Sequence, residues 1–278
     1  MKTKQLQRTI QMALLCFLTL FSAACASTGS AVSGGSSPGT IREARDYIPL
    51  YSQRTVFLYP DAPDTSPKME ITLSLFDITA PGKQFILTVL YEGQNTDEYA
   101  NKRLFGYDKM YGEMRLVAER IPDMPREALN WFYNEAFELS AGTSKVAVIS
   151  REWEYYTGGA HGMRNKDYYV FGLEEKQRLT LNDILREDAK TAVNDLVEAA
   201  LRKLMEIPDW IPLSEQGFFE NSVDKLEDFF LNSQGLGFQW DPYEIAPYST
   251  GLIEIVLPYD QLEGLFTERG LVLTKDFR

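Results

Sequence analysis

The only histidine of the chain lies in a glycine-rich turn. His161 follows Gly158 and Gly159 and is followed at once by Gly162. Glycines permit positive φ and a close approach of the backbone to a ligand, so this loop is either a rigid turn shaped for a ligand or a hairpin loop whose histidine bonds backbone groups. As a general base, His161 would need a nucleophile or an orienting carboxylate within hydrogen-bond reach. The spacing of residues fixes no such partner.

Two carboxylates, Glu152 and Glu154, precede this loop at a spacing of two residues. In a strand they share one face, opposite Trp153 and Tyr155, because successive side chains alternate. A carboxylate pair is the machinery of glycoside hydrolysis. Charged residues that alternate with aromatic ones are also typical of a half-exposed strand, so solvation explains the pair equally well.

Aromatic residues cluster around the loop and recur near the carboxyl end. Tyrosine and tryptophan anchor protein interfaces and stack on sugars, although many of them lie in cores. The set comprises Trp153, Tyr155, Tyr156, Tyr168, Tyr169, Trp240, Tyr243 and Tyr248. From the loop and this set we select the candidate ligand-binding residues Tyr155, Tyr156, Gly158, Gly159, His161, Gly162, Tyr168 and Tyr248.

The elements that position these residues follow from hydrophobic periodicity. Alternation at 69–75 and the dense apolar run 85–91 predict a hairpin with a Pro-Gly turn region. Spacings of three and four predict helices at 125–139 and 221–231, and a continuous apolar stripe predicts a long helix within 187–206. Further strands are predicted at 145–156, 168–173, 238–245, 252–257 and 271–274.

These elements lack a regular strand-helix-strand rhythm. Short turns between strands favour an α+β class with antiparallel sheets, packed helices and two small subdomains. We place a variable N-terminal α+β domain at 41–144 and a C-terminal α+β domain at 145–278. No low-complexity linker separates them.

Composition excludes several classes of protein. The chain has 278 residues, 40 Asp+Glu against 28 Lys+Arg, and a formal net charge of −12. Such a charge repels phosphate backbones, so we expect no nucleic-acid partner. With one histidine and two cysteines we expect no metal site and no cofactor. The 44% of hydrophobic residues suffices for a sizeable core.

The amino terminus carries an export address. Residues 1–24 have a basic start, a short apolar run and small residues, as in a secretory signal peptide. Cys25 follows in a sequence similar to a bacterial lipobox, with Ser22 where leucine is usual; the alternative is an ordinary signal peptide and a free cysteine. Residues 25–40 then form an uncharged Ser/Gly tether. We expect a lipid anchor at Cys25 that holds the protein at the bacterial envelope, on the extracytoplasmic side.

Three motifs resemble one bacterial envelope family of largely unknown function. They are Tyr155–Gly162 with Leu179–Ile184, Phe238–Trp240, and Tyr243–Gly251 with Leu257–Tyr259. That family includes the lysozyme-binding extracytoplasmic region of the anti-sigma factor RsiV and accessory regions of some peptidoglycan deacetylases. The resemblance covers about residues 145–265 and implies a compartment and a fold rather than a reaction. The metal motifs of the deacetylases are absent from this sequence, and no lysozyme-contacting residue can be carried over.

Three functional hypotheses remain. The first is a non-enzymatic, envelope-anchored protein whose acidic domain binds lysozyme or a similar basic protein. The second is a module that binds peptidoglycan or another glycan through aromatic side chains. The third is a hydrolase that uses His161 with a carboxylate, and a purely structural role is also compatible with the sequence.

Overall fold

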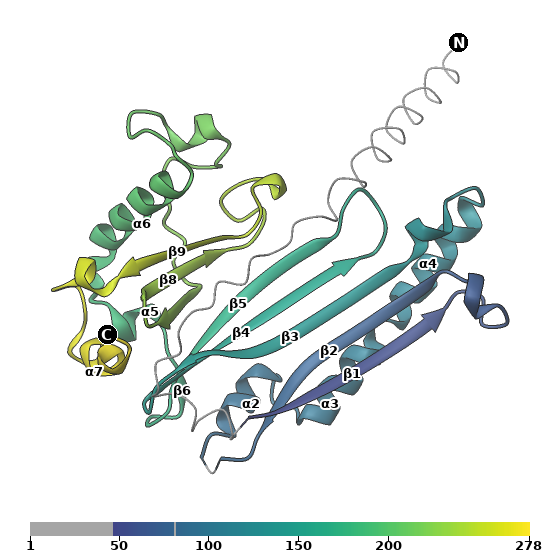
Figure 1. Ribbon diagram of the computed structural model, residues 1–278, viewed down its shortest axis with the longest axis horizontal. Coiled ribbons are helices and arrows are strands. Elements are labelled where there is room, and N and C mark those ends of the chain that lie inside the picture. Colours follow the sequence, from purple (N-terminus) through teal and green to yellow (C-terminus); the bar gives the residue numbers. More distant parts are fainter. Residues whose placement is uncertain (1–46, 81) are drawn as a thin grey trace, which may run out of the picture. The chain divides into compact units, whose positions relative to one another are not determined.

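The computed structural model describes residues 47–80 and 82–278. The predicted signal peptide, Cys25 and the predicted tether lie outside the described residues. Residues Thr40–Arg278 form one compact unit, whose described part combines a six-stranded sheet, a three-stranded sheet and several helices. The α+β class is therefore confirmed (Figure 1).

The large sheet has the strand order β1-β2-β3-β4-β5-β6. Its strands are β1 Tyr47–Phe57, β2 Lys68–Ile78, β3 Trp131–Gly142, β4 Val146–Tyr156, β5 Met163–Gly172 and β6 Gln177–Arg178. All neighbours are antiparallel except β2 and β3, which are parallel. This pair departs from the expected antiparallel pattern because the long connection 79–130 returns the chain to the same end of the sheet. The expected boundary between 144 and 145 lies in the β3–β4 turn of this sheet.

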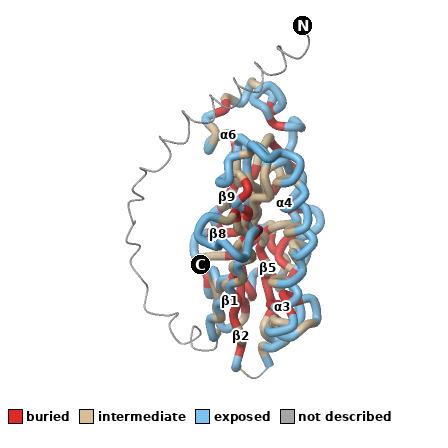
Figure 2. The backbone as a smooth tube through the Cα atoms, turned by 90° about the vertical axis from the view of Figure 1, so that its right-hand side faces the viewer, coloured by how far each residue is buried: buried red, intermediate tan, exposed pale blue. Residues whose placement is uncertain are grey.

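Three helices make that connection and cover one face of the sheet (Figure 1). They are α2 Phe85–Leu90, α3 Thr96–Gly106 and α4 Asp108–Arg120. A capping box between Asn95 and Glu98 begins α3. Alternate residues of β2, from Met69 to Leu75, are buried against these helices. Figure 2 shows the buried stretches along the strands and the exposed ones on the outer helices.

The small sheet is antiparallel and belongs to a second core. Its strands are β7 Phe229–Asn232, β8 Gly235–Trp240 and β9 Ile253–Pro258, accompanied by α5 Leu181–Ile184, α6 Lys190–Leu204 and α7 Glu268–Thr274. A Cβ on Gly237 would lie 2.1 Å from the ring of Phe230, so only glycine fits this strand position. Val146, Val148 and Val170 of the large sheet join the second core, which places β4 and β5 between the two cores.

Short 3-10 turns complete the described chain. They are Pro63–Thr65, Arg126–Leu129, Glu187–Ala189, Leu213–Gln216, Tyr248–Thr250, Tyr259–Leu262 and Lys275–Phe277.

The strands predicted at 145–156, 168–173 and 252–257 and the helix within 187–206 are confirmed as β4, β5, β9 and α6. The strand predicted at 238–245 begins and ends earlier, as β8. The apolar stripe of α6 buries Val193, Val197 and Leu201, which are spaced by four residues. In each case local periodicity agrees with the long-range packing.

Four other predictions are wrong. The run 85–91 is helix α2 rather than a strand, since Ile86 and Leu90 are buried one turn apart. The segment 125–139 forms most of β3 because period-two burial from Trp131 to Phe137 fits the pairing with β2 and β4. Residues 221–231 form an irregular segment followed by β7. Residues 271–274 are the last residues of helix α7 rather than a strand, and the side chain of Thr267 caps the start of this helix.

Candidate functional site

The β4–β5 loop, residues 157–162, is shaped by its glycines. Gly158 and Gly159 have φ of +87° and +97°, and a Cβ on Gly162 would lie 2.8 Å from the carbonyl oxygen of Tyr155. The hydroxyl of Tyr156 donates to the carbonyl oxygen of Gly159 (3.2 Å). Nδ1 of His161 donates to the carbonyl oxygen of Gly162 (2.8 Å). Backbone geometry therefore requires these glycines and holds the exposed His161 in place.

His161 stacks on Tyr248, which lies far along the chain. The ring centroids are 3.8 Å apart and the planes differ by 15°. Tyr243, half exposed and at positive φ, lies 5.9 Å from Tyr248 between ring centroids. The structure thus brings together two predicted site residues, His161 and Tyr248, and joins the β4–β5 loop to the β8–β9 connection.

A third segment, residues 205–227 after α6, is attached to the same connection. The backbone N–H of Phe219 donates to the carbonyl oxygen of Ile245 (3.0 Å), and Nζ of Lys225 donates to that of Glu244 (2.9 Å). This segment exposes Phe219 by 49% and Trp210 by 83%. We call His161, Tyr243, Tyr248, Phe219 and Trp210 the aromatic edge; its three segments are visible at the upper side of Figure 1.

Exposed carboxylates accompany Trp210 and Phe219 on the third segment. Residues 205–223 contain Glu206, Asp209, Glu215 and Glu220, all exposed, and no Lys or Arg. Sequence reasoning missed Trp210 and Phe219. The signal for Trp210 was its position between Pro208 and Pro212, which prevents the helix from continuing and leaves the tryptophan on an irregular segment.

The other predicted aromatic residues lie elsewhere. Tyr155 packs against the first core on the helix-covered side. Tyr168 is buried, stacks on Phe230 at 4.3 Å between centroids, and donates its hydroxyl hydrogen to Glu254 (2.9 Å). Burial raises the pKa of Tyr168 to about 12. Neither side chain contributes to the aromatic edge.

A polar groove runs beside the edge over the sheet face that lacks helices. Two hollows of about 370 and 580 Å³ share Glu152 and Arg164, and Tyr248 lines the larger one. Glu152 pairs with Arg164 (2.8 Å) and Lys166 (3.4 Å), while Glu154 accepts from Asn134 (2.8 Å). Burial alone raises the pKa of Glu152, but the bond from Arg164 and both cations lower it overall. Neither carboxylate contacts His161 among the described residues.

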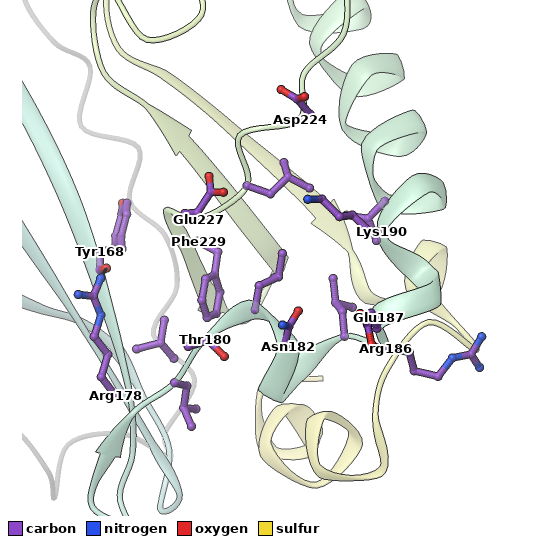
Figure 3. Close-up of a pocket in the computed structure, with 16 residues that line it drawn as sticks. Tyr168, Arg178, Thr180, Asn182, Arg186, Glu187, Lys190, Asp224, Glu227 and Phe229 are labelled. Carbon is purple, nitrogen blue, oxygen red and sulfur yellow. Dashed lines mark hydrogen bonds between the residues drawn. The ribbon is translucent and has the colours of Figure 1, made fainter.

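A separate cavity of about 580 Å³ lies between β5, α5, the start of α6 and residues 224–229 (Figure 3). Its floor is apolar and its rim is charged. Residues of the motif Leu179–Ile184 form part of its wall, a placement that the sequence does not predict. In α5 the backbone N–H of Thr180 donates to Asp183 (2.7 Å), and Asp183 pairs with Arg269.

Two carboxylates join the large sheet to the small one. The backbone N–H groups of Lys166 and Tyr168, on β5, donate to Asp241 (2.8 Å) and Asp228 (2.9 Å). Burial raises the pKa of Asp228 to about 8 and that of Asp241 to about 6, against the lowering effect of these bonds. The carboxylates of Asp167 and Glu244 raise both values further.

Within residues 47–80 and 82–278, no group of three or more His, Cys, Asp and Glu side chains is placed to hold a metal ion. In the same part of the chain no helix has the length and apolar character to cross a bilayer.

A family model matches part of the chain, and two solved structures match most of it. Residues 182–260 match the family model described as a protein of unknown function, DUF3298. The matched residues include Trp210, Phe219, Tyr243 and Tyr248, but not His161. A search of curated proteins finds no match.

Two solved structures of DUF3298 members share the fold. One, from Bacteroides fragilis, has a TM-score of 0.69 at 17% identity, covering 83% of this chain and 97% of its own. The other, from Pseudomonas aeruginosa PAO1, has a TM-score of 0.56 at 16% identity, covering 80% and 94%. At these identities the likeness shows the architecture, and the family model adds a domain of unknown function.

Proposed function

We propose that this chain is a non-enzymatic, envelope-anchored binding protein whose aromatic edge binds a basic protein, with a c-type lysozyme as the most concrete ligand. The observation that carries the proposal is the edge itself, where three segments present exposed Trp, Tyr, Phe and His side chains and one of them, residues 205–223, also carries four exposed carboxylates.

The physical reasons are two. Exposed aromatic side chains, above all Trp and Tyr, supply most of the energy at protein interfaces when a partner desolvates them. Carboxylates around them steer a basic partner to the same place and raise its association rate. Residues 181–278 hold 19 Asp+Glu and 8 Lys+Arg, so this part of the chain carries a net negative charge. The sequence resemblance to the lysozyme-binding region of RsiV favours the same class of ligand.

The location belongs to the same proposal. The signal-like residues 1–24 and the lipobox-like Cys25 support export and lipid anchoring, and the tether supports display of the folded unit away from the membrane. Mass spectrometry of the exported protein tests this, since a diacylated Cys25 at the new amino terminus is the expected product. A free Cys25 thiol would contradict it.

Binding is tested by calorimetry of residues 40–278 with a c-type lysozyme, at low and at physiological salt, together with an assay of lysozyme activity. We expect binding that weakens with salt, because salt screens exposed charges. We also expect Trp210→Ala to weaken the affinity at least tenfold. Tyr51→Ala is the matched control, since Tyr51 is a 65% exposed aromatic residue on β1. Absence of binding at both salt concentrations would refute the ligand.

A glycan ligand is the second candidate, and the polar groove favours it. The hydroxyls of Thr72 and Ser74 line the groove and make no hydrogen bond among the described residues, and Asn134 and Arg164 lie beside them. Such side chains suit sugar hydroxyls, and Tyr248 offers a ring at one end. Binding of soluble peptidoglycan fragments that is insensitive to salt and lost in Asn134→Ala would support this function instead.

The hydrolase hypothesis has less support. His161 contacts Tyr248 and Gly162 in the described structure, and the lowered pKa of Glu152 makes that residue a poor proton donor. Turnover of a glycan that His161→Ala abolishes without unfolding the protein would revive it.

A further inference from the structure

The cavity of Figure 3 has the size and lining of a small-molecule site. Its volume of about 580 Å³ falls within the usual range for ligand pockets, roughly 300–1,000 Å³. Buried apolar side chains form its floor, among them Val170, Leu179, Val193, Leu226 and Phe229. This floor favours a ligand with an apolar body.

The polar groups at the rim divide into two kinds. Arg178 and Arg186 are engaged, because Arg178 donates to the carbonyl oxygen of Tyr168 (3.4 Å) and Arg186 pairs with Asp188 (2.8 Å). Arg186 also points away from the cavity in Figure 3. The engaged arginines are therefore poorly placed to receive a ligand.

Five other rim side chains are uncommitted. They are Asn182, Glu187, Lys190, Asp224 and Glu227, which have no side-chain hydrogen bond or ion pair in the described structure. In Figure 3 Lys190 reaches from α6 toward the segment that carries Asp224 and Glu227. One uncommitted cation and three uncommitted carboxylates thus line one opening above an apolar floor.

This arrangement selects a class of ligand. A carboxylate is attracted by Lys190, with the Asn182 amide as a further donor, and an ammonium group is attracted by Asp224 and Glu227. A simple anion, such as a fatty acid, meets three repelling carboxylates, Glu187 included, and a simple cation meets Lys190. A molecule with both charges and apolar side chains satisfies the rim and the floor together.

The walls are fixed before a ligand arrives. The capping box of α5 and the Asp183–Arg269 pair hold the motif, and Gly270 packs so closely that a Cβ there would lie 2.0 Å from the carbonyl oxygen of Ile184. A preformed site loses little conformational entropy on binding. We infer that this cavity binds an apolar amino acid or short apolar peptide with a free ammonium group and a free carboxylate.

The test uses residues 40–278, the compact unit that contains both cores, with L-leucine and leucyl-leucine as probes in calorimetry. We expect saturable binding of at least one of them. Binding of leucine alone would indicate a site for a free amino acid, and binding of the dipeptide alone would indicate a site for a peptide. Three analogues each lack one feature: N-acetyl-leucine has no ammonium group, leucinamide no carboxylate and glycylglycine no apolar body. Each should bind at least tenfold more weakly than the better probe.

Variants locate the site. Lys190→Ala and the double change Asp224→Asn with Glu227→Gln should each weaken binding at least tenfold, and because these residues are exposed the fold should persist. Lys203→Ala and Asp195→Asn, on α6 but outside the cavity, are the matched controls. Binding of neither probe, equal binding of the blocked analogues, or equal losses in the control variants would overturn the inference.

Discussion

The two regions of this protein, each built around one sheet, differ in how much of their negative charge is paired. Residues 47–180 and residues 181–278 each contain 19 Asp+Glu, but the first region has 15 Lys+Arg and the second only 8. In the first region at least eight carboxylates pair with Lys or Arg side chains, one of them, Glu135, fully buried. In the second the described ion pairs involve four carboxylates. More of the negative charge of the second region is therefore available to a partner.

The centre of the first region is Glu135 on β3. Its side chain is fully buried and accepts from the hydroxyl of Tyr99 (2.9 Å) and from Nε of Arg151 (2.6 Å), with Nε of Arg103 at 3.5 Å. Burial lowers the pKa of Arg151, but the charge of Glu135 raises it overall. A buried charge is tolerated when it is paired and hydrogen-bonded in this way.

Glu135→Gln should give the largest effect. The change removes the buried counter-charge that Arg151 and Arg103 share, and leaves each arginine only its more exposed partner, Asp167 or Glu92. Removal of one partner of a buried pair costs about 3–5 kcal/mol. Urea denaturation measures the loss. Glu138→Gln, an exposed position on the same strand, should change the free energy of unfolding by less than about 0.5 kcal/mol. Equal effects would show that the contrast between buried and exposed charge is wrong.

The carboxylate that joins the two sheets should make stability depend on pH. With a pKa of about 8, folded Asp228 keeps its proton to a higher pH than in the unfolded chain, where the pKa is about 3.9. The unfolded state therefore binds fewer protons between these values, and the free energy of unfolding falls as pH rises through about 8.

Asp228→Asn should remove this fall while keeping an oxygen acceptor for the N–H of Tyr168. From pH 5 to pH 8.5 we expect the wild type to lose at least about 1.4 kcal/mol relative to the variant, the equivalent of one pKa unit. Denaturation at both pH values measures it, with the exposed Asp224→Asn as control. Parallel pH profiles for wild type and Asp228→Asn would rule out this role.

The contrast between regions was only partly visible in the sequence. The stripe of α6 and the alternation in β2 are local patterns that predict a helix and a strand, and the glycines of residues 157–162 predict a loop. The partner of β2 does not follow from such a pattern, because the β2–β3 pairing depends on three intervening helices. The contact of His161 with Tyr248 and the Asp228 bond to β5 do not follow either, since no short-range pattern encodes a contact across sixty residues or more.

Charge reversal near the aromatic edge tests the second region. Glu215→Lys with Glu220→Lys should slow association with a c-type lysozyme about tenfold at low salt, because local steering is lost. Glu113→Lys with Glu127→Lys changes the net charge equally in the first region, where both residues are exposed. Stopped-flow measurements at low salt compare the two. Equal slowing would mean that total charge, rather than its placement in the second region, steers the partner.

His161→Ala should have the smallest effect on stability and is informative for that reason. The residue belongs to the β4–β5 loop of the first region but stacks on Tyr248 of the second. The side chain is exposed, and an aromatic stack contributes about 0.5–1.5 kcal/mol, so we expect a loss below about 1 kcal/mol. Gly162→Ala, which forces a Cβ against the carbonyl oxygen of Tyr155, should cost more. If His161→Ala leaves stability intact yet weakens lysozyme binding, the loop serves the second region's surface; if it weakens stability alone, the histidine only closes the hairpin.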